Sequence, residues 1–124
     1  MANTVLLWIG SLLPIIWGIA HFFPTRSVVA GFGSISVDNR RIITMEWIAE
    51  GVALLFIGSV VLLATIIDRT SPVSVAVYWA SVVGLNVLSV VSLFTGFRIR
   101  FLPFRLCPPI FTGSSILILL GLLL

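Results

Sequence analysis

Charged residues are scarce in this chain of 124 residues, since only 9% are Asp, Glu, Lys or Arg and lysine is missing altogether. A soluble domain carries about 25% charged residues. Hydrophobic residues make up 60% of the chain, and its mean hydropathy is +1.26. One core cannot bury so much apolar surface, so we expect residues 1–124 to form a single integral membrane domain with lipid as its solvent.

Residues that bind metals are also few. Cys107 is the only cysteine, which excludes an internal disulfide, a CxxC redox pair and a zinc site built on cysteines. His21 is the only histidine, and the HExxH motif is absent. One histidine with two carboxylates, Glu46 and Glu50, is a weak metal signal. We therefore predict no metal site, and we find no haem signal.

Apolar residues gather in four segments, each long enough to cross a membrane as a helix. Only helices and closed barrels satisfy their own backbone hydrogen bonds in lipid. We therefore predict an all-α fold, a bundle of four transmembrane helices with a partly interfacial connector between the first two. The expected helices are about Thr4–Phe23, Ile42–Ile67, Val73–Phe97 and Cys107–Leu124.

The connector between the first two helices, Pro24–Arg41, mixes apolar residues with Gly, Ser and Arg. We expect one short amphipathic helix in it, lying on the membrane surface. Asp38 is the residue that we expect to cap the N-terminus of the second helix.

The arginines are distributed unevenly between the two sides of the predicted bundle. The second connection carries Arg69 alone. The positive-inside rule therefore predicts that the first and third connections are cytoplasmic and both termini lie on the opposite side, in a prokaryotic cytoplasmic membrane. We expect Arg40, Arg41, Arg98 and Arg100 to bind lipid phosphate. The first and third connections together carry Arg26, Arg40, Arg41, Arg98, Arg100 and Arg105.

Two carboxylates lie inside the second apolar segment, where an ionisable group costs about 2.5–3.5 kcal/mol on insertion scales. Glu46 and Glu50 are one helical turn apart and share a face of the helix. Glu46 is shallow enough to pair with an interfacial arginine. Glu50 is deeper, and it either faces a ligand or makes a structural hydrogen bond. With His21, these two residues are the candidates for catalysis.

Topology brings further polar and aromatic residues to the arginine side, because the first and third helices end there and the second begins there. We expect a pocket for a lipid-soluble ligand at this level. Structural roles remain the alternative, with the tryptophans in core packing and the histidine at the interface. The predicted lining is Glu50, Glu46, His21, Trp17, Trp47, Ser89, Ser92 and Asn86. Gly51 and Gly58, seven residues apart, are typical of close helix packing.

One stretch resembles a known family. It reads WGIAHFFPTRSVVAGFGSISVDNRRIITMEWIAEGVALLFIG, with Gly18 and His21 ending the first helix and Glu46 and Glu50 in the second. This order, over about residues 10–65, is similar to the DoxX-like family of small four-helix membrane proteins. The resemblance implies a role linked to quinone-coupled sulfur oxidation or to membrane complexes. Glu50 would match the glutamate common in that family's second helix, and His21 the polar residue that ends its first.

Three functions fit these residues. The first is a binding or accessory protein that holds a quinone or lipid-like molecule beside Glu50, Glu46 and His21. The second is an enzyme in which Glu50 or Glu46 acts as general acid and base on a lipid-like substrate. The third is an oligomeric, proton-coupled transporter or channel subunit. The expected partners are membrane lipid, a hydrophobic small molecule, and a second copy or a membrane subunit, with no nucleic acid.

Overall fold

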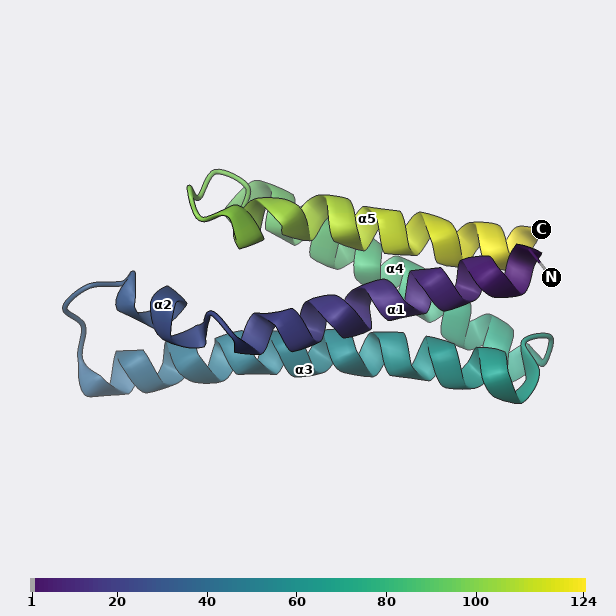
Figure 1. The fold of residues 1–124 in the computed structure, drawn as a ribbon, viewed down its shortest axis with the longest axis horizontal. Coiled ribbons are helices and arrows are strands. Elements are labelled where there is room, and N and C mark those ends of the chain that lie inside the picture. Colours follow the sequence, from purple (N-terminus) through teal and green to yellow (C-terminus); the bar gives the residue numbers. More distant parts are fainter. Residues whose placement is uncertain (1) are drawn as a thin grey trace.

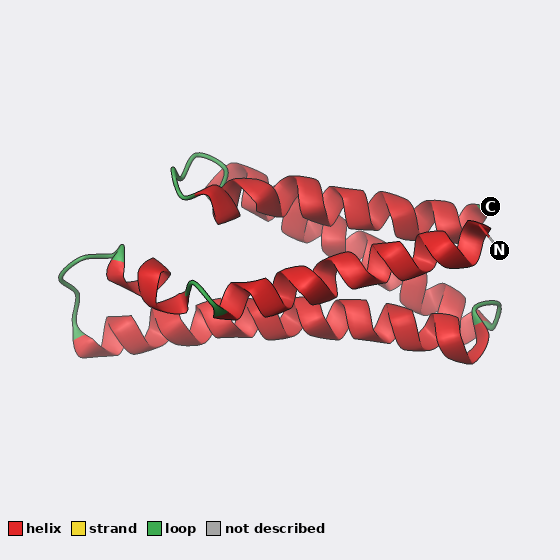
Figure 2. Cartoon of the chain, in the orientation of Figure 1, coloured by secondary structure: helices red, strands yellow, loops and turns green. Residues whose placement is uncertain are grey.

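The fold was analysed in a computed structural model that describes residues 2–124 (Figure 1). Helices and short connections make up this part of the chain, which contains no strand (Figure 2). Both termini lie at the same end as the α3–α4 turn. The all-α prediction is confirmed. The helices are α1 (Ala2–Phe22), α2 (Thr25–Ala30), α3 (Val37–Asp68), α4 (Pro72–Thr95) and α5 (Leu102–Leu123).

α3 and α5 begin earlier than expected from the sequence. Ser36 caps α3, because its side chain accepts a hydrogen bond from the Asn39 N–H at 3.2 Å. The expected cap, Asp38, is wrong, since it lies inside the first turn. α5 begins at Leu102, more than one turn before Cys107, and continues through two prolines. The short helix expected in the first connector is confirmed as α2.

α1 and α3 approach so closely that their backbones touch. A Cβ atom added to Gly18 would lie 2.6 Å from the carbonyl oxygen of Gly51. A Cβ atom added to Gly58 would lie 2.5 Å from the carbonyl oxygen of Ser11. No side chain fits at these distances, so the two helices can pack at this separation only where glycine stands. The packing role predicted for Gly51 and Gly58 is confirmed.

α1 also packs on α5, and a proline is tolerated at this contact. Pro14 lies inside α1 and is fully buried. Proline lacks an N–H, so the carbonyl four residues before it loses its helical partner. That carbonyl belongs to Gly10, and the buried hydroxyl of Ser114 on α5 donates a hydrogen bond to it. The interhelical bond therefore satisfies the group that the proline leaves free.

α4 is held to α5 along much of its length but to α3 only near the turn that joins them. At that turn, the Thr65 and Tyr78 hydroxyls lie 3.0 Å apart. Farther along, the Ser89 and Thr112 hydroxyls lie 2.7 Å apart and Asn86 donates to Ser115 at 2.6 Å. Figure 1 shows the consequence: α1 and α3 separate from α4 and α5 toward the end where α2 lies.

Large apolar side chains are exposed on all four long helices. Ile16 is 61% exposed, Phe56 67%, Phe94 79% and Leu123 64%. All four helices are long and apolar enough to cross a membrane. α3 has 32 residues and is therefore about 48 Å long. Its length exceeds the roughly 30 Å of a hydrocarbon core.

We predict that Gly58→Ala lowers the melting temperature of the detergent-solubilised protein. The new methyl group would force α1 and α3 apart at a contact between backbones, and overpacking costs about 1–3 kcal/mol. Gly84→Ala is the matched control, because a Cβ atom there meets nothing within 4 Å. Equal melting temperatures for the two variants would contradict the close contact.

Candidate functional site

The single histidine is buried at the arginine end of α1 and is only 3% exposed. Its Nδ1 lies 2.8 Å from the carbonyl oxygen of Trp17. A carbonyl oxygen only accepts hydrogen bonds, so Nδ1 carries a proton, and Nε2 of the neutral ring is left as an acceptor. This Nε2 is buried without a hydrogen-bond partner. His21 is therefore an oriented ring whose second nitrogen is unsatisfied.

Two tryptophans fix the position of this ring. Trp47 of α3 stacks on His21 with ring centroids 4.7 Å apart, and Trp17 meets it edge-on at 5.7 Å. The Trp47 Nε1–H also donates a hydrogen bond of 2.6 Å to the carbonyl oxygen of His21. This bond satisfies a carbonyl at the end of α1, where no further helical turn supplies a donor. Trp47 thus holds both the ring and the helix terminus.

A carboxylate and a thiol face the unsatisfied nitrogen. Glu50 Oε1 lies 3.6 Å from His21 Nε2, and the Glu50 side chain is 37% exposed. Cys107 of α5 is buried. The ligand atoms of all three side chains lie within 4.8 Å of one another. Three helices thus contribute an imidazole nitrogen, a carboxylate oxygen and a sulfur to one cluster.

A groove opens between α3 and α4 on the exposed side of Glu50. One part of it has a volume of about 530 Å³ and is lined mainly by α3, with Val28, Phe32, Leu88 and Phe104 opposite. A second part of about 340 Å³ is lined mainly by α4, and it shares Glu50, Leu88 and Phe104 with the first. We call these two parts the α3–α4 groove. Its walls are mainly apolar, and it exists because α4 leaves α3 beyond their common turn.

The structure brings together some of the predicted site residues and separates others. Glu46 is exposed and lines the groove beside Glu50, and Ser92 lines its α4 side. Ser89 does not reach Glu50, since its hydroxyl donates to the Pro108 carbonyl and pairs with a threonine of α5. Asn86 likewise bonds to α5. These two polar residues join α4 to α5, a function that spacing on α4 alone does not reveal.

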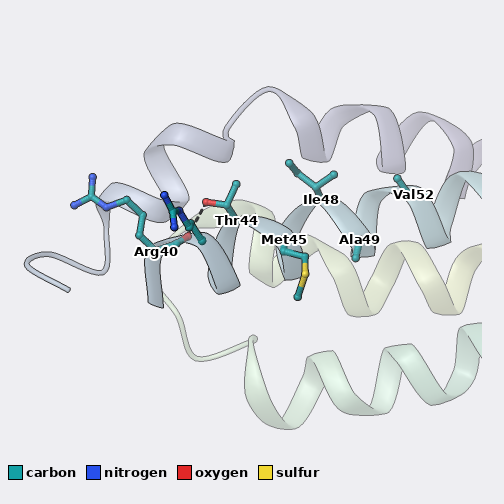
Figure 3. Close-up of a pocket in the computed structure, with 7 residues that line it drawn as sticks. Arg40, Thr44, Met45, Ile48, Ala49 and Val52 are labelled. Carbon is teal, nitrogen blue, oxygen red and sulfur yellow. Dashed lines mark hydrogen bonds between the residues drawn. The ribbon is translucent and has the colours of Figure 1, made fainter. Parts of the chain in front are cut away.

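The arginines lie at the surface. Arg41 is 3.9 Å from Asp38 in an exposed pair. Arg40 and Arg41 border a shallow depression along one face of α3, where Thr44 donates to the Arg40 carbonyl at 2.8 Å (Figure 3). One helix alone lines this depression, so it has no opposite wall to enclose a ligand. Arg98 and Arg100 are exposed too, and lipid-phosphate binding by all four stays a prediction.

Cys107 is the member of the cluster that sequence reasoning missed. In the sequence, Cys107 stands out only as a cysteine that has no second cysteine to pair with. Its position at the arginine end of the fourth helix places it at the level of His21, which the order of the helices could have indicated. Trp17 strengthens the connection, because its Nε1–H donates to the Cys107 sulfur at 3.4 Å. The Cys107 thiol in turn donates to the Pro103 carbonyl at 3.4 Å.

Comparison with known proteins adds no family to these findings. The chain matches no protein-family model, no curated protein and no solved structure. The similarity to the DoxX-like family therefore stays a prediction from short motifs.

We predict that Trp47→Phe destabilises the protein by about 1–3 kcal/mol, because the His21 carbonyl loses its 2.6 Å hydrogen bond and keeps only the 3.4 Å bond from the Thr25 hydroxyl. Phenylalanine keeps most of the stacking surface on the imidazole ring. The matched control is Trp79→Phe, whose side chain is 46% exposed. Thermal unfolding in detergent measures both variants, and equal loss of stability would show that the Trp47 hydrogen bond contributes nothing.

Proposed function

We propose that this chain is a small integral membrane protein that binds a lipid-soluble ligand, a quinone or a lipid-like molecule, in the α3–α4 groove. The observation that carries the proposal is Glu50, a half-buried carboxylate at the inner wall of a groove whose lining is mainly apolar. Such a combination of apolar walls and a few convergent polar groups is typical of small-molecule sites.

The dimensions of the groove favour an elongated ligand. Its two parts, about 530 and 340 Å³, fall in the range of about 300–1,000 Å³ that small-molecule pockets occupy. Apolar side chains such as Leu88 and Val91 would contact a hydrocarbon tail. Glu50 and Glu46 would meet a polar head with hydrogen-bond donors. Ligand exchange would occur sideways from lipid, because the groove opens between two neighbouring helices.

The membrane setting is supported by the exposed apolar faces of the four long helices and by the distribution of arginine. Arg26, Arg40 and Arg41 lie in or beside the first connection, and Arg98 and Arg100 in the third. We place these connections in the cytoplasm and both termini on the opposite side of a prokaryotic cytoplasmic membrane, following the positive-inside rule. The groove then opens toward the cytoplasmic leaflet.

The proposal includes an accessory role in a membrane complex, as the DoxX-like resemblance implies. A partner helix or a second copy would cover part of the apolar surface that remains exposed, in which Phe23, Ile67 and Phe94 are the most exposed large side chains. Catalysis by Glu50 and proton-coupled transport stay predictions from the sequence, since no further observation favours either.

We predict that Leu88→Trp lowers the amount of lipophilic molecule that co-purifies with the protein about tenfold, equivalent to about 1.4 kcal/mol. Leu88 lines both parts of the groove, so the larger indole would fill the space that the ligand needs. Solvent extraction of the purified protein followed by mass spectrometry measures the ligand per chain.

Val87→Trp is the matched control for this experiment. Val87 is the neighbouring residue of α4, is 56% exposed and is not among the residues that line the groove. It receives the same added bulk in the same helix. Ligand retained in Val87→Trp and lost in Leu88→Trp is the expected result. Equal retention in both, or no ligand specific to the wild-type protein, would overturn binding in the groove.

The orientation gives a separate prediction for the protein in its native membrane. In a Cys107→Ser background, we expect Ser34→Cys to be protected from a membrane-impermeant maleimide added outside intact cells. Thr70→Cys, in the opposite connection, is expected to react. Both positions are exposed turns, so access rather than burial decides the outcome. Labelling of Ser34→Cys alone would reverse the orientation.

A further inference from the structure

We infer that His21, Glu50 and Cys107 form a binding site for one divalent metal ion of the zinc class. The site adjoins the α3–α4 groove, whose lining includes Glu50 and Cys107 but not His21. It differs from the expectation drawn from the sequence, which predicted no metal site. A single cysteine excludes a site built on several thiolates, but it does not exclude a site with one sulfur, one nitrogen and one oxygen ligand.

The buried imidazole ring of His21 has one nitrogen, Nε2, without a hydrogen-bond partner. A histidine that binds a metal through one ring nitrogen almost always donates its other N–H to a carboxylate, a backbone carbonyl or a water. His21 has this arrangement, with Nδ1 on the Trp17 carbonyl at 2.8 Å and Nε2 buried without a partner. A buried acceptor that lacks a partner costs free energy. A cation bound at Nε2 removes that cost.

Three electron-pair donors lie close together, one each from His21, Glu50 and Cys107. When Glu50 is ionised and His21 is neutral, Oε1 and Nε2 are both acceptors, and they lie 3.6 Å apart with nothing to join them. A shared proton would satisfy these two atoms only. A metal ion satisfies both of them and also the Cys107 sulfur, which lies within 4.8 Å of each.

The distances suit a metal of this class. Atoms that lie within 4.8 Å of one another all lie within about 2.8 Å of a common point. Zinc bonds are about 2.0–2.3 Å long to nitrogen, oxygen and sulfur. The remaining difference is at most about 0.8 Å, and rotation of the half-exposed Glu50 side chain would shorten it. Hard cations such as Mg²⁺ and Ca²⁺ prefer oxygen ligands and are disfavoured by the thiolate and the imidazole.

Charge favours the metal complex in an apolar environment. A divalent cation with one carboxylate, one thiolate and one neutral imidazole has no net charge, so its burial avoids most of the cost of an isolated ion. On binding, the Cys107 thiol loses its proton and its hydrogen bond to the Pro103 carbonyl. The sulfur keeps the Trp17 N–H as a donor at 3.4 Å. Three protein ligands would leave one position of a tetrahedral metal ion for an exchangeable ligand.

The test uses Co²⁺ as a spectroscopic substitute for Zn²⁺, with full-length protein in detergent that has been stripped of metal by chelation and freed of any histidine tag. We expect one Co²⁺ per chain, a near-ultraviolet thiolate-to-cobalt charge-transfer band, and displacement of cobalt by one equivalent of Zn²⁺. Cys107→Ser should abolish the charge-transfer band. No bound cobalt, or cobalt bound without this band, would overturn the site.

A second pair of variants keeps the test decisive if Cys107→Ser does not fold. Glu50→Gln should weaken Co²⁺ binding at least about tenfold while the charge-transfer band remains at saturation, since the thiolate is untouched. Glu46→Gln is the matched control, because Glu46 is an exposed glutamate one turn away on the same helix. Equal affinities for the two variants would overturn the role of Glu50 and with it the three-ligand site.

Experiments can distinguish failure of the proposed metal site from failure of the proposed groove ligand. Leu88→Trp should lose the lipophilic ligand but bind Co²⁺ as the wild type does, because Leu88 is not a member of the cluster. Cobalt binding in a protein without any groove ligand would leave the metal site in place and remove the proposed function. A groove ligand in a protein that binds no cobalt would do the reverse.

Discussion

The rest of the structure depends on the backbone contact between α1 and α3. Gly18, Gly51 and Gly58 let the two helices touch where any side chain would hold them apart. His21 follows Gly18 by one turn, and Glu50 precedes Gly51 by one residue. The close contact therefore sets the distance between imidazole and carboxylate and places Trp47 where it can stack on the ring. A wider separation of these helices would disperse the cluster.

Polar hydrogen bonds decide where the molecule is open. Ser89 and Asn86 of α4 bond to α5, whereas the side-chain hydrogen bond between α3 and α4, which joins Thr65 and Tyr78, lies near their common turn. Hydrogen bonds between helices are among the forces that hold helices together when apolar faces meet a solvent of similar polarity. α4 consequently follows α5 rather than α3, and the α3–α4 groove is the space left over. The site is open at its side because α4 packs along α5 and not along α3.

Burial of the imidazole ring unites the two proposals. Two tryptophans and a backbone carbonyl orient His21 so completely that one nitrogen is satisfied and the other is not. Proteins rarely leave a buried polar atom without a partner, and a bound ion is one of the explanations for such an atom. Glu50 is the link between this buried cluster and the groove, because its side chain touches both. A metal held by the cluster would lie beside the groove, because Glu50 and Cys107 also line it.

Composition alone predicted the all-α fold, because long apolar helices satisfy their own backbone hydrogen bonds without water. The packing role of Gly51 and Gly58 and the neighbouring positions of His21 and Glu50 also followed from helical period and helix order. Only the tertiary structure decided that Ser89 and Asn86 bond to α5 and that Cys107 joins the cluster. Helical period says which residues share a face, but which neighbour that face meets depends on packing between helices distant in the sequence.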